Sequence, residues 1–182
     1  VPSKTSVTAL KQELLNKQKI EAKSMKTESE KNIITPARKG TLIHLALQKI
    51  ENDNIENMIE NLNINKQEKE VLLNNKELLE DYIKSELFAE LKLAKEVHKE
   101  VPFYMNIPYK DTDEKILIQG VIDLYYISKS GELILVDYKT DNLINEEEFI
   151  ERYSYQLDLY KQALEQALNK NVDKKYIYST KL

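Results

Sequence analysis

Two carboxylates and one lysine stand close together in the second half of the chain. Asp137 and Lys139 end the apolar segment 132–140, and Asp123 interrupts the preceding apolar segment, 120–126. An ionised carboxylate on an apolar strand is costly unless a cation or hydrogen-bond donors pair it. Two such carboxylates on adjacent strands therefore indicate a divalent cation. With a lysine beside them, they form a combination typical of metal-dependent phosphodiester cleavage.

Two predicted strands position these side chains. Segments 115–128 and 132–140 are apolar on both faces, as in a covered sheet, and a turn containing Gly131 joins them as antiparallel neighbours. Side chains alternate along a strand, so Asp137 and Lys139 share a face. One face of the first strand is expected to carry Leu117, Gln119, Val121, Asp123 and Tyr125. The two aspartates then come within reach of one cation. The alternative is an Asp–Lys pair at the surface and an unrelated aspartate.

Apolar residues recur at helical spacing through most of the first half of the chain. This pattern predicts helices at 6–15 and 39–50 and two or three more within 51–97, with breaks near 61–65 and 74–75. The intervening residues 17–36 are poor in core residues and are predicted to form a helix tail and a mobile loop.

The second half changes to strand periodicity. Residues 100–107 are predicted to form a strand, which Pro102 restricts to an edge or a bulge. A long amphipathic helix is predicted at 145–169 and a last strand at 174–180. The predicted order is therefore helices, three strands, a helix and a strand.

The composition is that of one globular domain. The chain has 182 residues, of which 41% are hydrophobic and 32% charged, and neither a membrane span nor a secretory signal is predicted. The absence of cysteine excludes disulfides, thiolate zinc sites and cysteine-bound iron–sulfur clusters within this chain. With only three glycines it has no P-loop for ATP. The net charge of −4 restricts any contact with nucleic acid to a local basic patch.

Three short motifs together resemble the RecB-type nucleases of the PD-(D/E)xK superfamily. They are Gly120-Val-Ile-Asp123, Asp137-Tyr-Lys139-Thr140, and Gln156 with Tyr160 four residues later. The resemblance implies that Asp123 and Asp137 bind Mg²⁺ or Mn²⁺, with the backbone carbonyl of Tyr138 as a further ligand, and that Lys139 is catalytic. It also implies that Gln156 and Tyr160 support the site and the DNA phosphate.

Two further residues match elements of the same family. His44, on the predicted helix 39–50, matches a histidine that completes the metal site. Glu100 matches an acidic residue at the start of a strand and is an accessory candidate. Without the resemblance, each of these two would be an ordinary surface or core residue.

Segments 6–11 and 39–48 narrow the resemblance to the C-terminal nuclease domains of AddA-type helicase–nuclease subunits. It implies an α/β (α+β) fold with a restriction-endonuclease-like core, a mixed central sheet flanked by helices and a helical N-terminal half. It implies one nuclease domain over 1–182, mainly helical over 1–99, with a sheet-bearing catalytic core over 100–182. ATP would act only through a motor upstream of this chain, which agrees with a start at a residue other than methionine.

The expected function is cleavage of single-stranded DNA as it leaves a motor at broken DNA ends, in the cytoplasm. By resemblance, an AddB-type protein is the partner, and any iron–sulfur cluster belongs to that partner. Two alternatives stay open. One is a catalytically silent module of the same fold that binds DNA or a partner protein, and the other is a standalone RecB-like nuclease.

Overall fold

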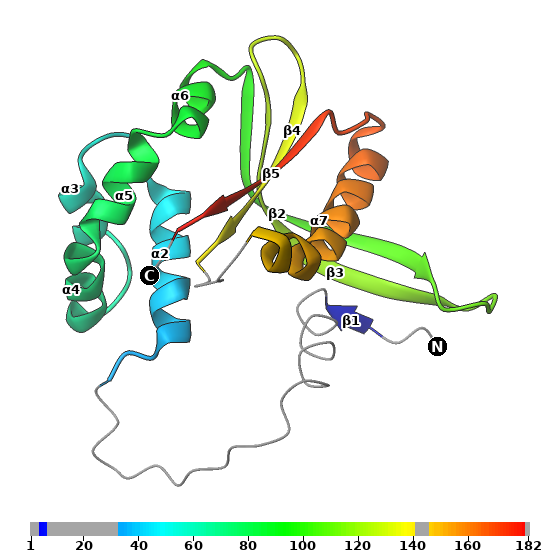
Figure 1. Ribbon diagram of the computed structural model, residues 1–182, viewed down its shortest axis with the longest axis horizontal. Helices are drawn as coiled ribbons and strands as arrows, with labels where there is room; N and C mark the ends of the chain where they lie inside the picture. Colours follow the sequence, from blue (N-terminus) through cyan, green and yellow to red (C-terminus); the bar gives the residue numbers. More distant parts are fainter. Residues whose placement is uncertain (1–3, 7–32, 141–145, 181–182) are drawn as a thin grey trace, which may run out of the picture.

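The computed structural model describes residues 4–6, 33–140 and 146–180, in which one mixed sheet lies between two groups of helices (Figure 1). The strands are β1 (Lys4–Ser6), β2 (Glu96–Pro108), β3 (Lys115–Ile127), β4 (Leu133–Lys139) and β5 (Lys174–Ser179). The helices are α2 (Pro36–Lys49), α3 (Ile55–Glu60), α4 (Lys66–Asn74), α5 (Lys76–Ile83), α6 (Glu86–Leu93) and α7 (Glu146–Leu168). Among these helices, none has the length and apolar character needed to cross a bilayer.

Strand β3 organises the sheet. It pairs antiparallel with β2 along its whole length and antiparallel with β4 from Leu124↔Val136 to Ile127↔Leu133. Its first half also pairs in parallel with β1, and β5 pairs in parallel with β4. The mixed sheet with flanking helices confirms the predicted α+β fold class. It also places Asp123 on β3 and Asp137 on β4 near the middle of the sheet, where the pairing of these two strands stops.

Helices α2 to α6 cover one face of the sheet. Helix α2 begins at Pro36, and the Thr35 hydroxyl caps it by accepting the Arg38 N–H at 3.2 Å. Its apolar stripe packs with residues of α3 to α6 and with the side chains that β3 and β4 direct to this face. This first core contains Leu42, Ile43, Ala46, Leu47, Leu72, Leu79, Tyr82, Leu124, Ile134 and Val136. The stripe fixes how α2 lies on the sheet, and hence the side chains that α2 presents to the acids.

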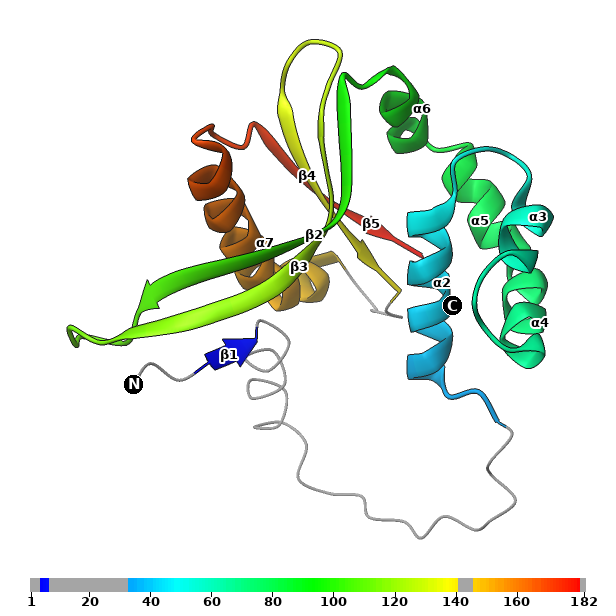
Figure 2. The same ribbon diagram turned by 180° about the vertical axis from the view of Figure 1, so that it is seen from behind.

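Helix α7 covers the opposite face (Figures 1 and 2). Its buried residues Leu157, Tyr160, Ala163 and Leu164 pack against Phe103, Met105, Ile118, Ile122, Leu133 and Leu135. Each fully buried aliphatic or aromatic side chain contributes about 1.5–3 kcal/mol. This second core therefore holds α7 firmly over β3 and β4.

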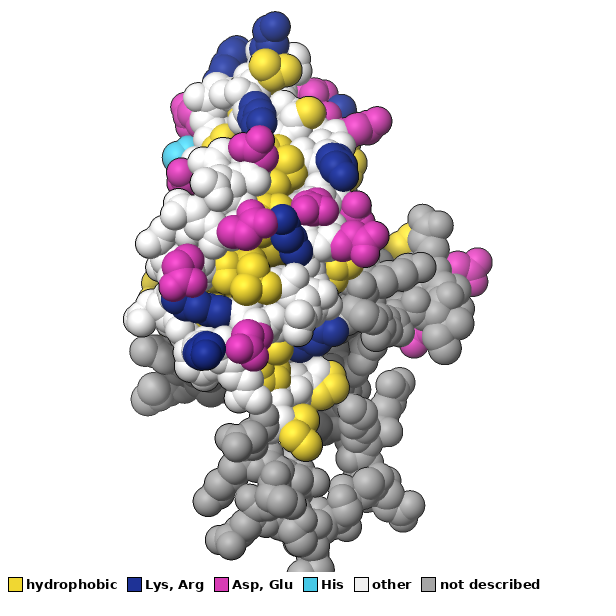
Figure 3. Space-filling view, turned by 90° about the vertical axis from the view of Figure 1, so that its left-hand side faces the viewer, with side chains coloured by type: hydrophobic (Ala, Val, Ile, Leu, Met, Phe, Trp, Pro, Cys, Tyr) yellow, Lys and Arg dark blue, Asp and Glu magenta, His cyan; other side chains and the backbone are white. Residues whose placement is uncertain are grey.

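The helical half is more divided than predicted. Residues 51–97 contain four helices, α3 to α6, and not two or three. Local caps explain the extra breaks, because the side chains of Asn54, Asn65 and Ser85 each accept a backbone N–H at the start of a new helix. Acidic and basic side chains are intermixed over the outer surface of this half (Figure 3), with ion pairs such as Arg38–Glu68.

The strands also differ from the predictions at two places. Ser6, expected to begin a helix, lies in β1, which was not predicted; residues 7–32 lie outside the described residues. Strand β2 begins at Glu96, four residues before the predicted start at Glu100, within a segment expected to be helical. Pro102 does lie on a strand that, among the described residues, pairs only with β3.

The simple alternation predicted for β3 is wrong around Asp123. Ile122 and Tyr125 both belong to the core beneath α7, whereas strict alternation puts them on opposite faces. The pairing between β2 and β3 passes over Glu100 and Asp123, and Glu100 has a φ of 53°. Both strands bend strongly along their length (Figure 2). This local distortion changes the direction of the side chains next to the candidate acid.

We expect a buried tyrosine pair to contribute measurably to stability. The hydroxyl groups of Tyr82 on α5 and Tyr138 on β4 are hydrogen-bonded at 2.8 Å in the first core. Tyr82→Phe leaves the other hydroxyl unpaired and is expected to cost about 1–3 kcal/mol. The measurement is urea unfolding, with Tyr155→Phe on the exposed side of α7 as the control. In the double variant Tyr82→Phe/Tyr138→Phe the loss should be less than additive; strict additivity would contradict the coupling.

Candidate active site

Asp123 and Asp137 lie directly beyond the last residues that pair between β3 and β4. The antiparallel pairing ends at Leu124↔Val136, and the backbone N–H of Tyr138 donates to Asp123 Oδ2 at 2.9 Å. The two carboxyl groups are close enough for each to shift the pKa of the other. They are 8% and 3% exposed. The structure therefore brings together the two acids that the sequence pairs, in a largely dehydrated position.

The two carboxyl groups have opposite pKa shifts. Burial raises the pKa of Asp137 to about 7, and the neighbouring charge of Asp123 adds to the rise, while Lys139 opposes it. Burial also acts to raise the pKa of Asp123, but hydrogen bonds with His44, Asp137 and the Tyr138 N–H outweigh it and hold that pKa below its usual value. Of the two carboxyl groups, Asp137 is therefore the one that takes up a proton first as the pH falls.

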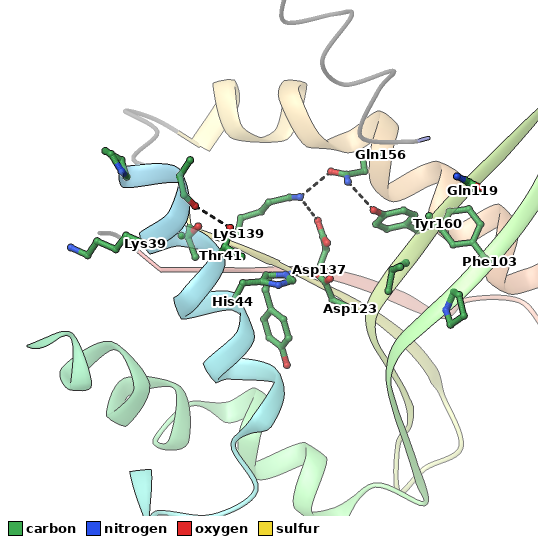
Figure 4. A pocket seen from close by; sticks show the side chains of 18 of the residues that line it. Lys39, Thr41, His44, Phe103, Gln119, Asp123, Asp137, Lys139, Gln156 and Tyr160 are labelled. Carbon is green, nitrogen blue, oxygen red and sulfur yellow. Dashed lines mark hydrogen bonds and ion pairs between the residues drawn. The ribbon is translucent and has the colours of Figure 1, made fainter. Parts of the chain in front are cut away.

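Lys139 connects the acids to helix α7. Its Nζ donates to Asp137 Oδ2 at 2.9 Å and to Gln156 Oε1 at 2.9 Å, and Gln156 Nε2 donates to the Tyr160 hydroxyl at 2.9 Å (Figure 4). Gln156 and Tyr160 are one helical turn apart and therefore share a face of α7. The Lys139 Nζ also lies 4.5 Å from the centre of the Tyr153 ring. Tyr153 was not singled out from the sequence, although it also lies one turn before Gln156.

His44 approaches the acids from the other side of the sheet. Its Nε2 lies 2.9 Å from Asp123 Oδ2, and its ring meets Tyr138 edge-on with 5.7 Å between ring centres. Tyr138 is in turn held by Tyr82. Helix α2 thus places the one histidine that the sequence selected directly against the first acid.

Glu100 is not brought to this group. Its carboxylate lies 3.7 Å from the Lys49 Nζ, and the side chain is 45% exposed. It is absent from the described residues that line the cleft around the acids. The accessory role suggested for Glu100 stays a prediction.

The acids, His44 and Lys139 open into one cleft of about 1150 Å³. Its wall also includes residues to which sequence reasoning assigned no role in the site, namely Lys39, Thr41, Pro102, Tyr104, Gln119, Val121 and Thr140. Lys39 and Thr41 surround the predicted histidine on α2, so the helical period of that segment could have indicated them. The strand residues enter the cleft only because α7 covers the opposite face of β2 and β3.

The donor groups around the acids suit a hard divalent cation better than zinc, because they are mainly oxygen atoms. Among the described residues, no group of three or more His, Cys, Asp or Glu side chains is arranged to hold a metal ion. The contacts explain this: His44 engages Asp123, and Lys139 engages Asp137. The raised pKa of Asp137 indicates that His44 and Lys139 only partly offset the cost of burying two negative charges together. A bound divalent ion would offset more of that cost.

Comparison with known proteins decides the family. The sequence profile of the PD-(D/E)XK nuclease superfamily matches residues 14–181 of this chain. The chain belongs to the PD-(D/E)XK nuclease superfamily. This confirms the superfamily that the motifs predicted, and nucleases of the superfamily generally use divalent metal ions.

Two curated relatives extend the comparison of this PD-(D/E)XK chain. Both are named as subunits of an ATP-dependent helicase/nuclease. The protein of Clostridium botulinum (strain Kyoto / Type A2) is 34% identical over 98% of this chain and 16% of its own length. The protein of Clostridium kluyveri is 36% identical over 80% of this chain and 13% of its own length. The chain therefore spans about one sixth of the curated relatives that it matches over nearly its whole length.

We expect the buried Asp137 carboxyl to make metal-free stability depend on pH. The pKa of Asp137 is about 7 in the folded chain, above the usual 3.8. The stabilisation of the folded state by the protonated carboxyl group is therefore full below about pH 4 and is lost as the pH rises through 7. In EDTA at pH 8, Asp137→Asn should therefore melt higher than wild type, by at least about 2 °C. The advantage should shrink or reverse at pH 5.

Thermal melts over pH 5–8 test this expectation. Asp158→Asn on the exposed surface of α7 serves as the control, because its carboxylate pairs with Lys175 away from the cleft. Parallel pH profiles for wild type and Asp137→Asn would contradict a raised pKa at Asp137.

Proposed function

We propose that the chain is a metal-dependent DNA nuclease domain that hydrolyses phosphodiester bonds. The observation that carries the proposal is the placement of Asp123, Asp137 and Lys139 just beyond the point where the pairing of β3 with β4 stops, in one cleft with His44 and Gln156. Buried acids with shifted pKa values in a cleft are typical of catalytic sites. Membership of the nuclease superfamily supports the same reaction.

The proposed metal ligands are Asp123, Asp137, His44 and the backbone carbonyl of Tyr138, for Mg²⁺ or Mn²⁺. When bound, such an ion polarises the scissile phosphate and lowers the pKa of a bound water. For the ion to bind, His44 would release its present contact with Asp123, and Lys139 would release its contact with Asp137. The Tyr138 N–H keeps Asp123 in place during the exchange, because it holds Oδ2 from the backbone.

Lys139 acts on the attacking water or on the phosphate. Its Nζ is held between Asp137 and Gln156, so it is positioned to donate a hydrogen bond beside the acids. Donors placed in advance where charge develops are the main contribution of many active sites. Gln156 fixes Lys139, and Tyr160 fixes Gln156. In this proposal Gln156 and Tyr160 also support a phosphate of the bound DNA.

We further propose that the chain is one domain of a longer helicase–nuclease protein. The support is the name and length of its relatives, ATP-dependent helicase/nuclease subunits of which this chain spans only 16%. In this proposal a motor elsewhere uses ATP, an AddB-type protein is the partner, and this domain cuts the single strand that emerges at a double-strand break during recombinational repair. Such a substrate places the protein in the cytoplasm.

The direct test is cleavage of labelled single-stranded DNA with Mg²⁺, Mn²⁺ or EDTA. We expect metal-dependent cleavage that falls at least about a hundredfold in Lys139→Ala, because the lysine donor at the reacting phosphate is removed. Lys161→Ala, on the exposed side of α7, is the matched control and should cut normally. A folded Lys139→Ala protein with undiminished activity would contradict the assignment.

No cleavage by a folded wild-type chain, under conditions where it binds DNA, would favour the silent binding module. The same assay on the full-length protein with its partner then separates that module from a domain that needs its motor. Binding driven by phosphate contacts should weaken steeply with salt.

A further inference from the structure

Exposed apolar side chains form one wall of the cleft. Tyr104 is 71% exposed and Val121 is 48% exposed. In the β2–β3 register Tyr104 lies opposite Gln119 and Pro102 lies opposite Val121. Directly opposed and alternate residues of two paired strands share a face. The four residues Pro102, Tyr104, Gln119 and Val121 therefore form one continuous surface, the Tyr104 patch, and all four line the cleft.

The opposite face of the same ribbon is buried. Phe103, Met105, Ile118 and Ile122 pack in the core beneath α7. This burial fixes the alternation, so the Tyr104 side chain faces away from α7, and Tyr104 lines the cleft. A tyrosine exposed in this way, beside two further apolar residues and a glutamine, is informative because large exposed apolar patches commonly mark binding sites.

The patch is within reach of the acids. Val121 and Gln119 precede Asp123 on β3 by two and four residues, which corresponds to about 7 and 14 Å along a strand. Tyr104 lies opposite Gln119 and is therefore about 14 Å from the acids. This distance corresponds to about four nucleotides of a polynucleotide stacked at 3.4 Å per nucleotide, and to fewer nucleotides if the polynucleotide is extended. A polynucleotide with its phosphate at Asp123 passes over this patch if it leaves the cleft along β3.

The positive charge of the cleft provides little affinity for a polynucleotide. Of the described residues that line the cleft, Lys39 and Lys139 are the only lysines or arginines, and Lys139 is engaged by Asp137. The whole chain carries a net charge of −4. Binding of a polyanion therefore needs a contribution that does not depend on phosphate contacts. Stacking of bases on aromatic side chains supplies such a contribution in proteins that bind single strands.

We propose that the Tyr104 patch is a stacking platform for unpaired nucleobases of the strand whose phosphate enters the acid–lysine site. This inference rests on the proposed nuclease function and adds a residue that selects single-stranded DNA. The Tyr104 ring stacks on a base, and Pro102 and Val121 flank it with apolar surface. Bases within a duplex are already stacked on both faces, so the platform favours a single strand.

A tryptophan reporter tests the stacking directly. The chain contains no tryptophan, so Tyr104→Trp creates a single tryptophan at the platform, which can be excited separately from the tyrosines. Ca²⁺ replaces Mg²⁺ so that the strand is bound and not cut. We expect oligothymidylate to quench the fluorescence, and an abasic oligonucleotide of the same length and charge to leave it nearly unchanged. Equal quenching by both oligonucleotides, or none by either, would overturn the proposal.

Affinity and kinetics give an independent test. By fluorescence anisotropy, Tyr104→Ala should bind labelled oligothymidylate about tenfold more weakly than wild type, whereas Tyr104→Phe should retain the affinity. Both variants should bind the abasic strand as wild type does. Tyr176→Ala is the matched control, because Tyr176 is a strand tyrosine, 44% exposed, on β5. For DNA cleavage, Tyr104→Ala should raise KM and leave kcat nearly unchanged.

A small chromogenic phosphodiester, bis(p-nitrophenyl) phosphate, separates this inference from the proposed function. It is too short to reach Tyr104 while its phosphate is at the acids, so Tyr104→Ala should hydrolyse it at the wild-type rate, whereas Lys139→Ala should not hydrolyse it. Equal losses by Tyr104→Ala on base-bearing and abasic strands, or no loss on either, would overturn the platform and leave the nuclease assignment intact. In the latter case the patch is a surface for a protein partner. Hydrolysis that is insensitive to Lys139→Ala would overturn the proposed function instead.

Discussion

The hydrogen bond from the Tyr138 backbone N–H to Asp123 Oδ2 is the contact on which the arrangement of the site depends. It joins β3 to β4 just beyond their last backbone pair and so sets Asp123 against Asp137. Two carboxyl groups in a buried position repel each other and lose hydration, so the fold has to supply compensating donors. These donors come from both faces of the sheet, His44 from α2 and Lys139 from β4 itself, supported by α7.

Each helical layer is therefore part of the site. On one face, Tyr82 holds Tyr138, and Tyr138 meets the His44 ring. Lys99 on β2 donates to the carbonyl oxygens of Gln48 and Ile50 at 3.0 and 3.3 Å, which ties the C-terminal end of α2 to the sheet. On the other face, the α7 core leaves Gln156 beside Lys139 and turns the Tyr104 patch toward the cleft. The proposed metal binding and the proposed substrate contact thus depend on the same two packing surfaces.

The proximity of the two acids and the lysine could be predicted from the sequence because the signal is local: charged residues within two apolar strands that a short turn joins. Gln156 and Tyr160 follow from helical spacing. The direction of side chains at Asp123 could not be predicted, because it depends on a backbone distortion at Glu100 on the neighbouring strand. Strand β1 escaped prediction because three residues carry little periodicity and its partner is distant in sequence. The platform residue Tyr104 becomes evident only once the face that α7 covers is known.

The central claim is that Asp123 and Asp137 together hold a divalent ion. Titration of Mn²⁺ into the chain, followed by electron paramagnetic resonance of the free ion, tests it without any dependence on DNA. Wild type and the Asp158→Asn control should bind Mn²⁺ alike, and Asp123→Asn and Asp137→Asn should each bind it more than about tenfold more weakly, because each loses a charged ligand. Unchanged Mn²⁺ affinity in both cleft variants would contradict the account and leave the two acids as a structural pair.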